Sequence, residues 1–117
     1  MNDLDKLLKL ARAKKATDVH IAAGSPVMLR IEGELIPATK EALSSPLAKE
    51  LTYTLLDQDQ ISDFEKSLDL DFMTSDADHQ RYRVNISYND GDVGAVIRLL
   101  AATPMPLSEL QLPEYGD

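Results

Sequence analysis

The chain of 117 residues is long enough for one domain with its own hydrophobic core, and its 44% apolar and 27% charged residues are typical of a globular protein. It contains no cysteine, which excludes a disulfide framework, a thiolate nucleophile and a cysteine-ligated zinc site. Twelve basic residues against 20 acidic ones give a net charge of −8, which argues against nucleic acids, anionic membranes and phosphates as partners.

The first 16 residues are basic, unlike the rest of the chain, and they predict a helix. They hold five bases against two acids, a net of +3, whereas residues 17–117 hold seven bases against 18 acids, a net of −11. Within 3–15 the apolar residues recur at helical spacing and form one stripe: Leu4, Leu7, Leu8 and Ala11. Short strands are predicted next at 18–21, 27–31 and 34–37, with Glu32-Gly33 as a tight hairpin turn.

Two helices are predicted in the middle of the chain. Ser45-Pro46 is a helix start with Ser45 as the cap, and the expected buried stripe is Leu47, Leu51, Thr54 and Leu55. A second helix over 58–67 is capped by Asp57 or Asp59, and its apolar side is Ile61, Phe64 and Leu68. Leu68, Leu70 and Phe72 then alternate with aspartates, which is a strand period.

The clearest pattern is a hairpin over residues 81–99. Apolar and polar residues alternate strictly on both sides of the turn Asn89–Asp92. One face is therefore expected to be core, formed by Tyr82, Val84, Ile86, Tyr88, Val93, Ala95, Ile97 and Leu99. The element order predicts an α+β fold, a mostly antiparallel sheet with helices packed on one face, and PAS-like is the nearest named architecture.

The domain is expected to end near residue 101. Half of all the prolines lie in the last 14 residues, at Pro104, Pro106 and Pro113. Residues 1–101 are thus predicted to form the PAS-like domain, and residues 102–117 a linker or docking tail.

The other face of the hairpin brings two like charges together. Whether the loop has two or four residues, Arg83 lies directly opposite Arg98, and only a three-residue loop would break this pairing. Opposed like charges destabilise a ladder, and Arg81 adds a third positive charge on that face. Two explanations stay open: solvent or nearby carboxylates match the arginines, or the pair binds an anion from outside the domain. Arginine favours bidentate recognition of phosphate or carboxylate, and Arg30 could belong to the same set.

Other candidate sites are weaker. Asp18 and His20 share a strand face and could act as a base and its orienting group, although a hydrogen-bonded structural pair is the better interpretation. His79 lies in an acidic loop and is expected to be exposed. Two histidines without cysteine do not favour a metal site, and no glycine-rich phosphate-binding loop occurs.

Several short motifs occur in order along almost the whole chain. Those in the first half are Ala16-Thr17-Asp18-Val19-His20-Ile21, Ala23-Gly24-Ser25-Pro26 and Leu29-Arg30-Ile31-Glu32-Gly33-Glu34-Leu35. Those in the second half are Leu70-Asp71-Phe72, Arg81-Tyr82-Arg83-Val84-Asn85, Gly94-Ala95-Val96-Ile97-Arg98 and Pro104-Met105-Pro106-Leu107-Ser108-Glu109-Leu110-Gln111-Leu112-Pro113. Together they resemble the N-terminal domain of type IV pilus retraction (PilT-like) ATPases of the type II/IV secretion ATPase superfamily. Thr17 for serine and Glu32 for aspartate are conservative departures, whereas residues 74–80 match nothing in the family.

The resemblance implies a part in a larger motor for twitching motility. In the family this domain packs on the ATPase domain of the neighbouring subunit in a homohexamer, and arginines of its sheet approach the ATP phosphates. By position in the motifs these are Arg83 and Arg98, with Arg81 as a third, and the linker with Pro104, Pro106 and Pro113 is the hinge. The family's ATPase domain with its phosphate loop follows that linker. We expect this chain to be a first domain that ends at the boundary, or the product of a gene without the second domain.

The chain by itself is then expected not to be an enzyme and to hold no cofactor or metal, with ATP and Mg²⁺ bound in the parent motor. The implied partners are the neighbouring ATPase domain and the machinery at the pilus base, and the implied location is the cytoplasm beside the inner membrane. No apolar run approaches the roughly 18 residues of a membrane-spanning helix, and no signal-peptide core is present. The alternative is a free-standing PAS-like sensory or adaptor module with a partly polar internal cavity. A metal-independent hydrolase using Asp18 and His20 has no nucleophile to name.

Overall fold

The computed structural model describes residues 3–75, 79–89 and 91–100. Within these ranges, three helices and six strands follow one another in the order that the sequence predicts. In chain order they are α1 (Asp3–Ala13), β1 (Asp18–Ile21), β2 (Met28–Ile31), β3 (Glu34–Pro37), α2 (Ser45–Tyr53), α3 (Gln58–Ser67), β4 (Asp69–Ser75), β5 (Arg81–Asn89) and β6 (Asp92–Leu99). No helix in these ranges is long and apolar enough to cross a membrane.

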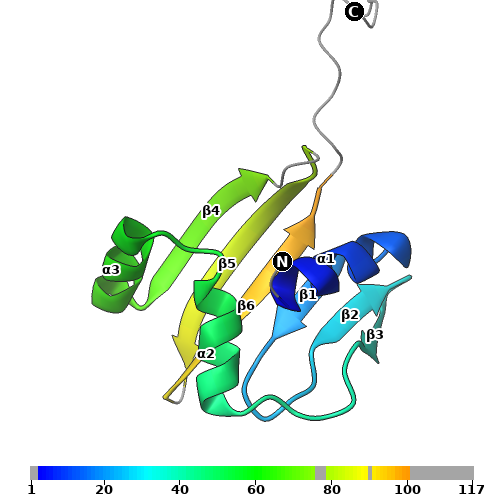
Figure 1. Ribbon diagram of the computed structural model, residues 1–117, viewed down its shortest axis with the longest axis horizontal. Coiled ribbons are helices and arrows are strands. Elements are labelled where there is room, and N and C mark those ends of the chain that lie inside the picture. Colours follow the sequence, from blue (N-terminus) through cyan, green and yellow to red (C-terminus); the bar gives the residue numbers. More distant parts are fainter. Residues whose placement is uncertain (1–2, 76–78, 90, 101–117) are drawn as a thin grey trace, which may run out of the picture.

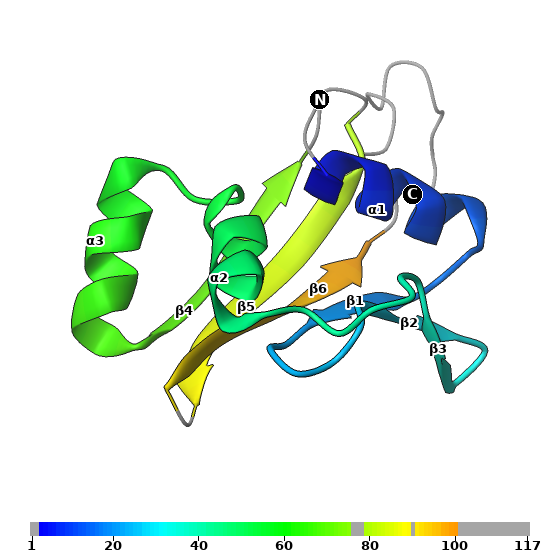
Figure 2. The ribbon, with the colours of Figure 1, turned by 60° about the horizontal axis from the view of Figure 1, so that its bottom comes forward.

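The strands form one antiparallel sheet in the order β3-β2-β1-β6-β5-β4. The first and last of the described strands, β1 and β6, pair at the centre of this sheet. They join the strands β1–β3 to the strands β4–β6. Figures 1 and 2 show α1, α2 and α3 on the same face of this sheet. The predicted α+β class is confirmed, while the PAS-like label stays a prediction.

Local signals set most of the turns and helix ends. At the β2–β3 turn, Glu32 and Gly33 have φ angles of 52° and 84°, the left-handed pair that a tight hairpin needs. Asp57 caps α3 in a capping box with Gln60. The predicted cap of α2 was one residue late, because the hydroxyl of Ser44, not Ser45, accepts from the Leu47 N–H at 3.2 Å. Pro46 still fits, since no N–H in the first helical turn has a partner within the helix.

The core lies between the helices and the inner face of the sheet. Its least exposed members include Val19, Ile21, Leu29, Phe64, Val84, Ile86 and Ile97. In α2 the buried residues are Ala48, Leu51 and Thr52, so the predicted stripe was wrong at Leu47, which is 39% exposed, and at Thr54, which is also exposed. Ala48 is small and fully buried, which suits the close packing of α2 on β6, whereas Leu47 is exposed.

Tyr88 is the main exception on the predicted core face. It pairs with Val93 as expected, yet it is 43% exposed. The residue lies near the β5–β6 turn, where it lines a pocket at the edge of the α2–α3 cover. Alternation identified the correct face of the strand, but it could not show how far the helices extend.

A glycine allows β1 and β6 to approach closely. A Cβ atom at Gly94 would lie 2.9 Å from the carbonyl oxygen of Ile21, closer than real Cβ atoms come. This contact fixes the central strand pair, and therefore the positions of the side chains that β1 and β6 carry on the other face.

Candidate functional site

The open face of the sheet, opposite the helices, carries a row of charged side chains. The register places Arg98 opposite Asp18 on one side and opposite Arg83 on the other. Asp18 in turn faces Arg30 on β2. The predicted opposition of Arg83 and Arg98 is therefore confirmed, and it lies inside a longer row with the order Leu35, Arg30, Asp18, Arg98, Arg83 and Met73.

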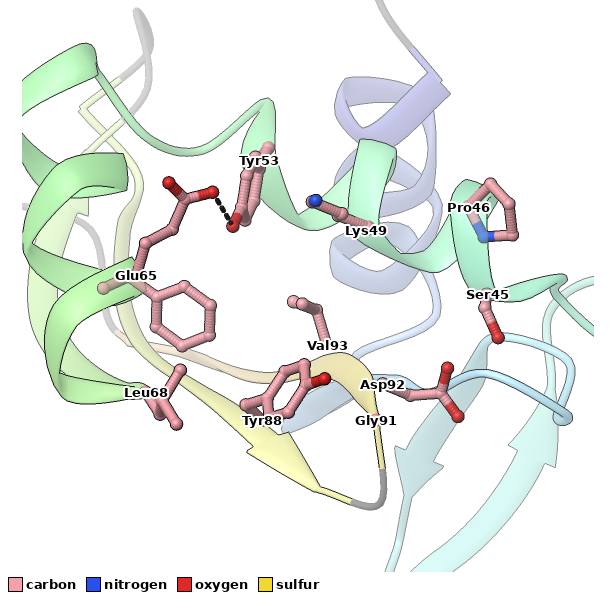
Figure 3. Close-up of a pocket in the computed structure, with 11 residues that line it drawn as sticks. Ser45, Pro46, Lys49, Tyr53, Glu65, Leu68, Tyr88, Gly91, Asp92 and Val93 are labelled. Atoms are coloured by element: carbon pink, nitrogen blue, oxygen red, sulfur yellow. Dashed lines mark hydrogen bonds between the residues drawn. The ribbon is translucent and has the colours of Figure 1, made fainter.

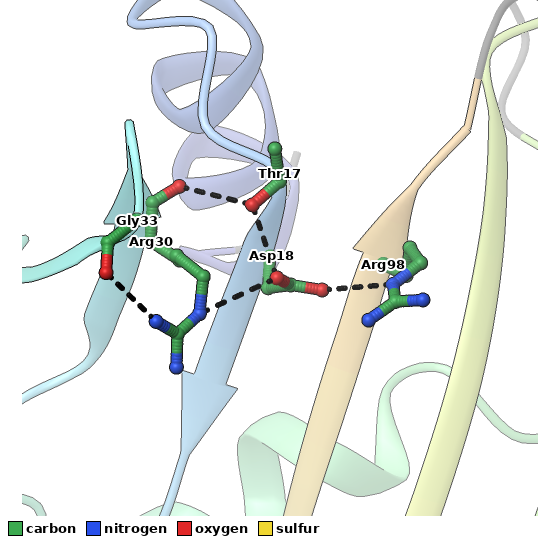
Figure 4. A network of polar contacts seen from close by, with 5 residues as sticks. All are labelled: Thr17, Asp18, Arg30, Gly33 and Arg98. Atoms are coloured by element: carbon green, nitrogen blue, oxygen red, sulfur yellow. Dashed lines mark hydrogen bonds and ion pairs between the residues drawn. The ribbon is translucent and has the colours of Figure 1, made fainter.

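Asp18 is the buried centre of this row (Figure 4). Its side chain is only 7% exposed, and its Oδ1 accepts a hydrogen bond from the Arg98 Nε at 3.1 Å. Its Oδ2 lies 3.7 Å from the Arg30 Nε and accepts from the Thr17 hydroxyl at 3.0 Å. Arg30 also donates through Nη1 to the Gly33 carbonyl at 3.0 Å. One carboxylate thus holds two arginines from two neighbouring strands.

Arg83 has a weaker partner. Its Nη2 lies 3.5 Å from the Asp71 Oδ2, and the two side chains are 62% and 49% exposed. Exposed pairs of this kind contribute only about 0–1 kcal/mol. Each arginine therefore has a carboxylate partner, as one of the two explanations from the sequence expected. The partner of Arg98 is buried and lies at 3.1 Å, whereas the partner of Arg83 is exposed and lies at 3.5 Å.

The arginine pair borders a shallow hollow with room for a ligand group. The hollow has a volume of about 210 Å³ and is lined by Asp71, Arg83, Asn85, Val96 and Arg98. Arg98 is 66% exposed, and Asp18 engages only its Nε, so its two terminal amino groups are not held by that contact. Two guanidinium groups at one hollow can bind an anion bidentately.

Arg81 lies apart from this pair. It lines a separate hollow of about 240 Å³ with Met73, Thr74 and Ser75. The structure therefore brings Arg83 and Arg98 together and places Arg81 next to them along β5 but outside their hollow.

Asp18 and His20 lie on the same strand face without bonding each other. The contacts of Asp18 go to Thr17, Arg30 and Arg98, while the His20 Nε2 is buried with no hydrogen-bond partner among the residues that the structure describes. Among the described contacts, neither a base with its orienting group nor the hydrogen-bonded structural pair expected from the sequence is formed. His79 is exposed, as predicted. Within the described ranges, no cluster of histidine and acidic side chains is suited to a metal ion.

Arg12 is a structural arginine that the sequence reasoning missed. It donates to the carbonyl oxygens of Leu100 at 3.4 Å and Arg81 at 3.5 Å, and its guanidinium lies 5.2 Å from the centre of the Tyr82 ring. These contacts tie α1 to the ends of β5 and β6. One signal was available, because Arg12 follows the buried Ala11 and is the one arginine among the bases of the first 16 residues.

A hollow near the covered face is a second candidate site (Figure 3). It measures about 590 Å³ and is lined by Ser45, Pro46, Lys49, Tyr53, Phe64, Glu65, Leu68, Tyr88, Gly91, Asp92 and Val93. The Tyr53 hydroxyl donates to the Glu65 carboxylate at 3.1 Å, and the Lys49 Nζ lies 5.4 Å from the Tyr53 ring centre. Partial burial, and then the Glu65 carboxylate, raise the pKa of Tyr53.

The sequence is similar to two proteins of Pseudomonas aeruginosa. It is 32% identical to the type IV pilus ATPase PilU and 30% identical to the type IV pilus retraction ATPase PilT, over 96% of this chain in both cases. The chain spans only 29% of the length of PilU and 33% of PilT. No family model matches the chain.

The fold is similar to that of solved ATPases. The crystal structure of the pilus retraction motor PilT with bound ADP matches 97% of this chain and 33% of that chain, with a TM-score of 0.79 and 26% identity. The ATPase DotB of Legionella pneumophila matches 95% of this chain and 32% of its own, with a TM-score of 0.71 and 25% identity. Over almost its whole length the chain is therefore similar to the N-terminal domain of the PilT-like secretion ATPases.

Proposed function

We propose that this domain serves a hexameric pilus-retraction ATPase by packing on the nucleotide-binding domain of the neighbouring subunit and presenting Arg83 and Arg98 to its ATP. Arg81 would add positive charge beside them. The observation that carries the proposal is the direct opposition of Arg83 and Arg98 on the open face. The two like charges repel across the ladder, and the side chains stay 62% and 66% exposed although each has a carboxylate partner.

The geometry is suited to contact with phosphates. The exposed ends of both guanidinium groups border one hollow, and each can form two parallel hydrogen bonds to phosphate oxygens. Arg83 would exchange its exposed partner Asp71 for the phosphate, at a cost of about 0–1 kcal/mol. Both arginines would neutralise charge on the transferring γ-phosphoryl group, an effect worth roughly 10³–10⁵ in rate for arginine fingers.

The remaining chemistry is proposed for the ATPase domain. PilT binds ADP in its crystal structure, so a nucleotide with Mg²⁺ is the expected cofactor of the parent protein. The guanidinium groups of this domain fit the phosphates, and we place the ligands of Mg²⁺ in the ATPase domain. By itself this domain would then bind ATP weakly and catalyse no hydrolysis.

Nucleotide-dependent contacts would also move the domain. If ATP contacts Arg83 and Arg98 better than ADP does, the bound nucleotide biases the position of the domain. The predicted hinge, with Pro104, Pro106 and Pro113, lies outside the described residues and stays a prediction, as does the boundary at residue 101. Association with the pilus base, in the cytoplasm beside the inner membrane, belongs to the same proposal. A free-standing sensory module is less favoured, because the relatives are ATPases.

The test is the ATPase activity of the full-length protein that carries this domain. Arg83→Ala and Arg98→Ala should each lower turnover at least about tenfold, because each removes a charge that acts on the transferring phosphoryl group. Lys66→Ala, which removes an exposed charge at the end of α3, is the matched control and should leave turnover unchanged. Normal turnover in both arginine variants would reject the proposal.

A further inference from the structure

We infer that Asp18 is the positioning residue of Arg98, and that Arg30 holds Asp18 in place. The inference rests on the proposed function of Arg98 and assigns a role to a residue that the proposed function does not include. Asp18 is one of two polar or charged residues in the described ranges that are as buried as the core; the other is Thr52. A buried carboxylate persists only if it is paired and hydrogen-bonded, which Asp18 achieves with Arg98, Arg30 and Thr17.

The contact between Asp18 and Arg98 determines which end of the arginine is free. Asp18 binds the Nε, which lies closest to the backbone, at 3.1 Å. The stem of the side chain is thereby fixed, while that contact leaves the terminal amino groups free on a side chain that lines the hollow shared with Arg83. An arginine held in this way loses less rotamer freedom when it binds a phosphate, so its affinity and its geometry both improve.

Arg83 gives an internal comparison for this arrangement. Its ion pair with Asp71 uses a terminal amino group, measures 3.5 Å and joins two exposed side chains. To donate two parallel hydrogen bonds to a phosphate, Arg83 would have to release Asp71 from this amino group. Arg98 is therefore pre-positioned for the anion, while Arg83 must exchange partners.

Arg30 belongs to the support of Asp18 rather than to the anion site. Its Nε faces the Asp18 Oδ2 and its Nη1 donates to the Gly33 carbonyl in the β2–β3 turn. Figure 4 shows the resulting chain of contacts from Gly33 through Arg30 and Asp18 to Arg98. The contacts of β1 with both β2 and β6 make this chain possible, because Asp18 lies between the two arginines in the sheet.

The first experiment uses the 117-residue chain and follows the arginine Nε–Hε signals by NMR. In the native chain the Hε of Arg98 should exchange with water at least about tenfold more slowly than that of Arg83, because it is hydrogen-bonded to a buried carboxylate. Asp18→Asn should remove that protection without changing the Arg83 signal. Equal exchange at both arginines, or an unchanged Arg98 signal in Asp18→Asn, would overturn the inference.

The second experiment is a double-mutant cycle on the turnover of the full-length ATPase. Asp18→Asn should lower kcat about three- to tenfold with little change in KM, and it should add nothing when Arg98 is already alanine. Asp69→Asn is the matched control on the same face, where the exposed Asp69 accepts from Asn85 at 3.3 Å, and it should stay within about twofold. If the losses in turnover from Asp18→Asn and Arg98→Ala multiply in the double variant, Asp18 does not act through Arg98.

The outcomes separate this inference from the proposed function. If Arg98→Ala leaves turnover unchanged, the proposed function fails, and the NMR experiment still decides the Asp18–Arg98 contact. If Arg98→Ala lowers turnover but a folded Asp18→Asn protein does not, the positioning role fails alone. If Asp18→Asn does not fold, Arg30→Gln replaces it, with an expected loss of about two- to threefold that must also vanish in the Arg98→Ala background.

Discussion

The two faces of the sheet differ in how their side chains contribute to the stability of the fold. On the covered face, alternate residues of β5 and β6 such as Val84, Ile86 and Ile97 are fully buried under the helices, and each favours the folded state. On the open face, the same strands place Arg83 against Arg98, a pairing that does not favour it. The covered face is explained by folding alone. On the open face each arginine has a carboxylate partner within the domain but stays largely exposed, and this is the face where we propose that an outside anion binds.

The largest expected effect on stability lies on the covered face. Ile97→Ala removes a fully buried side chain at the centre of the sheet and should lower the free energy of unfolding by about 2–5 kcal/mol. Denaturant titration of the chain measures this change. The exposed Val96 beside it gives the control, and Val96→Ala should cost much less; equal losses would contradict the division into two faces.

The next effect tests the central strand pair that supports both faces. Gly94→Ala places a methyl group 2.9 Å from the Ile21 carbonyl oxygen, so β1 and β6 must move apart. We expect a loss of about 1–3 kcal/mol in the free energy of unfolding, as for other overpacked sites. A stability equal to that of the native chain would mean that the close approach is not a constraint.

A smaller effect is expected from pH at the pocket of the covered face. The pKa of Tyr53 is raised above its ordinary 10.0 in the folded chain, so the folded state retains the phenolic proton longer than the unfolded state does. This contribution is complete below pH 10 and should be lost as the pH rises through the folded-state pKa. The measurement is the denaturation midpoint at pH 8 and above pH 10. The two midpoints should differ less in Tyr53→Phe than in the native chain. An identical difference in both proteins would exclude Tyr53 as a cause of the loss of stability at high pH.

The smallest effect on stability is predicted for the open face. Arg83→Ala breaks only an exposed ion pair and removes the repulsion from Arg98, so the free energy of unfolding should change by less than about 1 kcal/mol. A loss as large as that of Ile97→Ala would show that the arginine pair serves the fold, and would remove the reason to seek an anion there.

The sequence was sufficient to predict the hairpin and its arginine pair. Strict alternation and the turn at Asn89–Asp92 left few registers, and the observed pairs Val84–Ile97 and Arg83–Arg98 are those expected. The Asp18–Arg98 contact could not be predicted in this way. It joins residues 80 positions apart and depends on β1 pairing with β6, which no local pattern specifies.

The predictions that failed depend on where the helices lie on the sheet, which local sequence patterns do not specify. Ser44 and Ser45 are both good caps, and the choice between them depends on where α2 meets the sheet. The exposure of Tyr88 likewise depends on how far α2 and α3 extend over the β5–β6 turn. Arg12 was missed because its acceptors are backbone carbonyls, and these have no sequence signature.

The most direct test of the account measures turnover and stability on the same substitution. With both Arg83 and Arg98 changed to alanine, the full-length ATPase should lose at least about tenfold in turnover, while the 117-residue chain still folds. Its denaturation midpoint should fall in the double variant but not in Arg83→Ala alone, because only the loss of Arg98 removes a partner of the buried Asp18. A double variant that hydrolyses ATP at the normal rate would contradict the central claim that the open face of this sheet acts on the nucleotide of a neighbouring subunit.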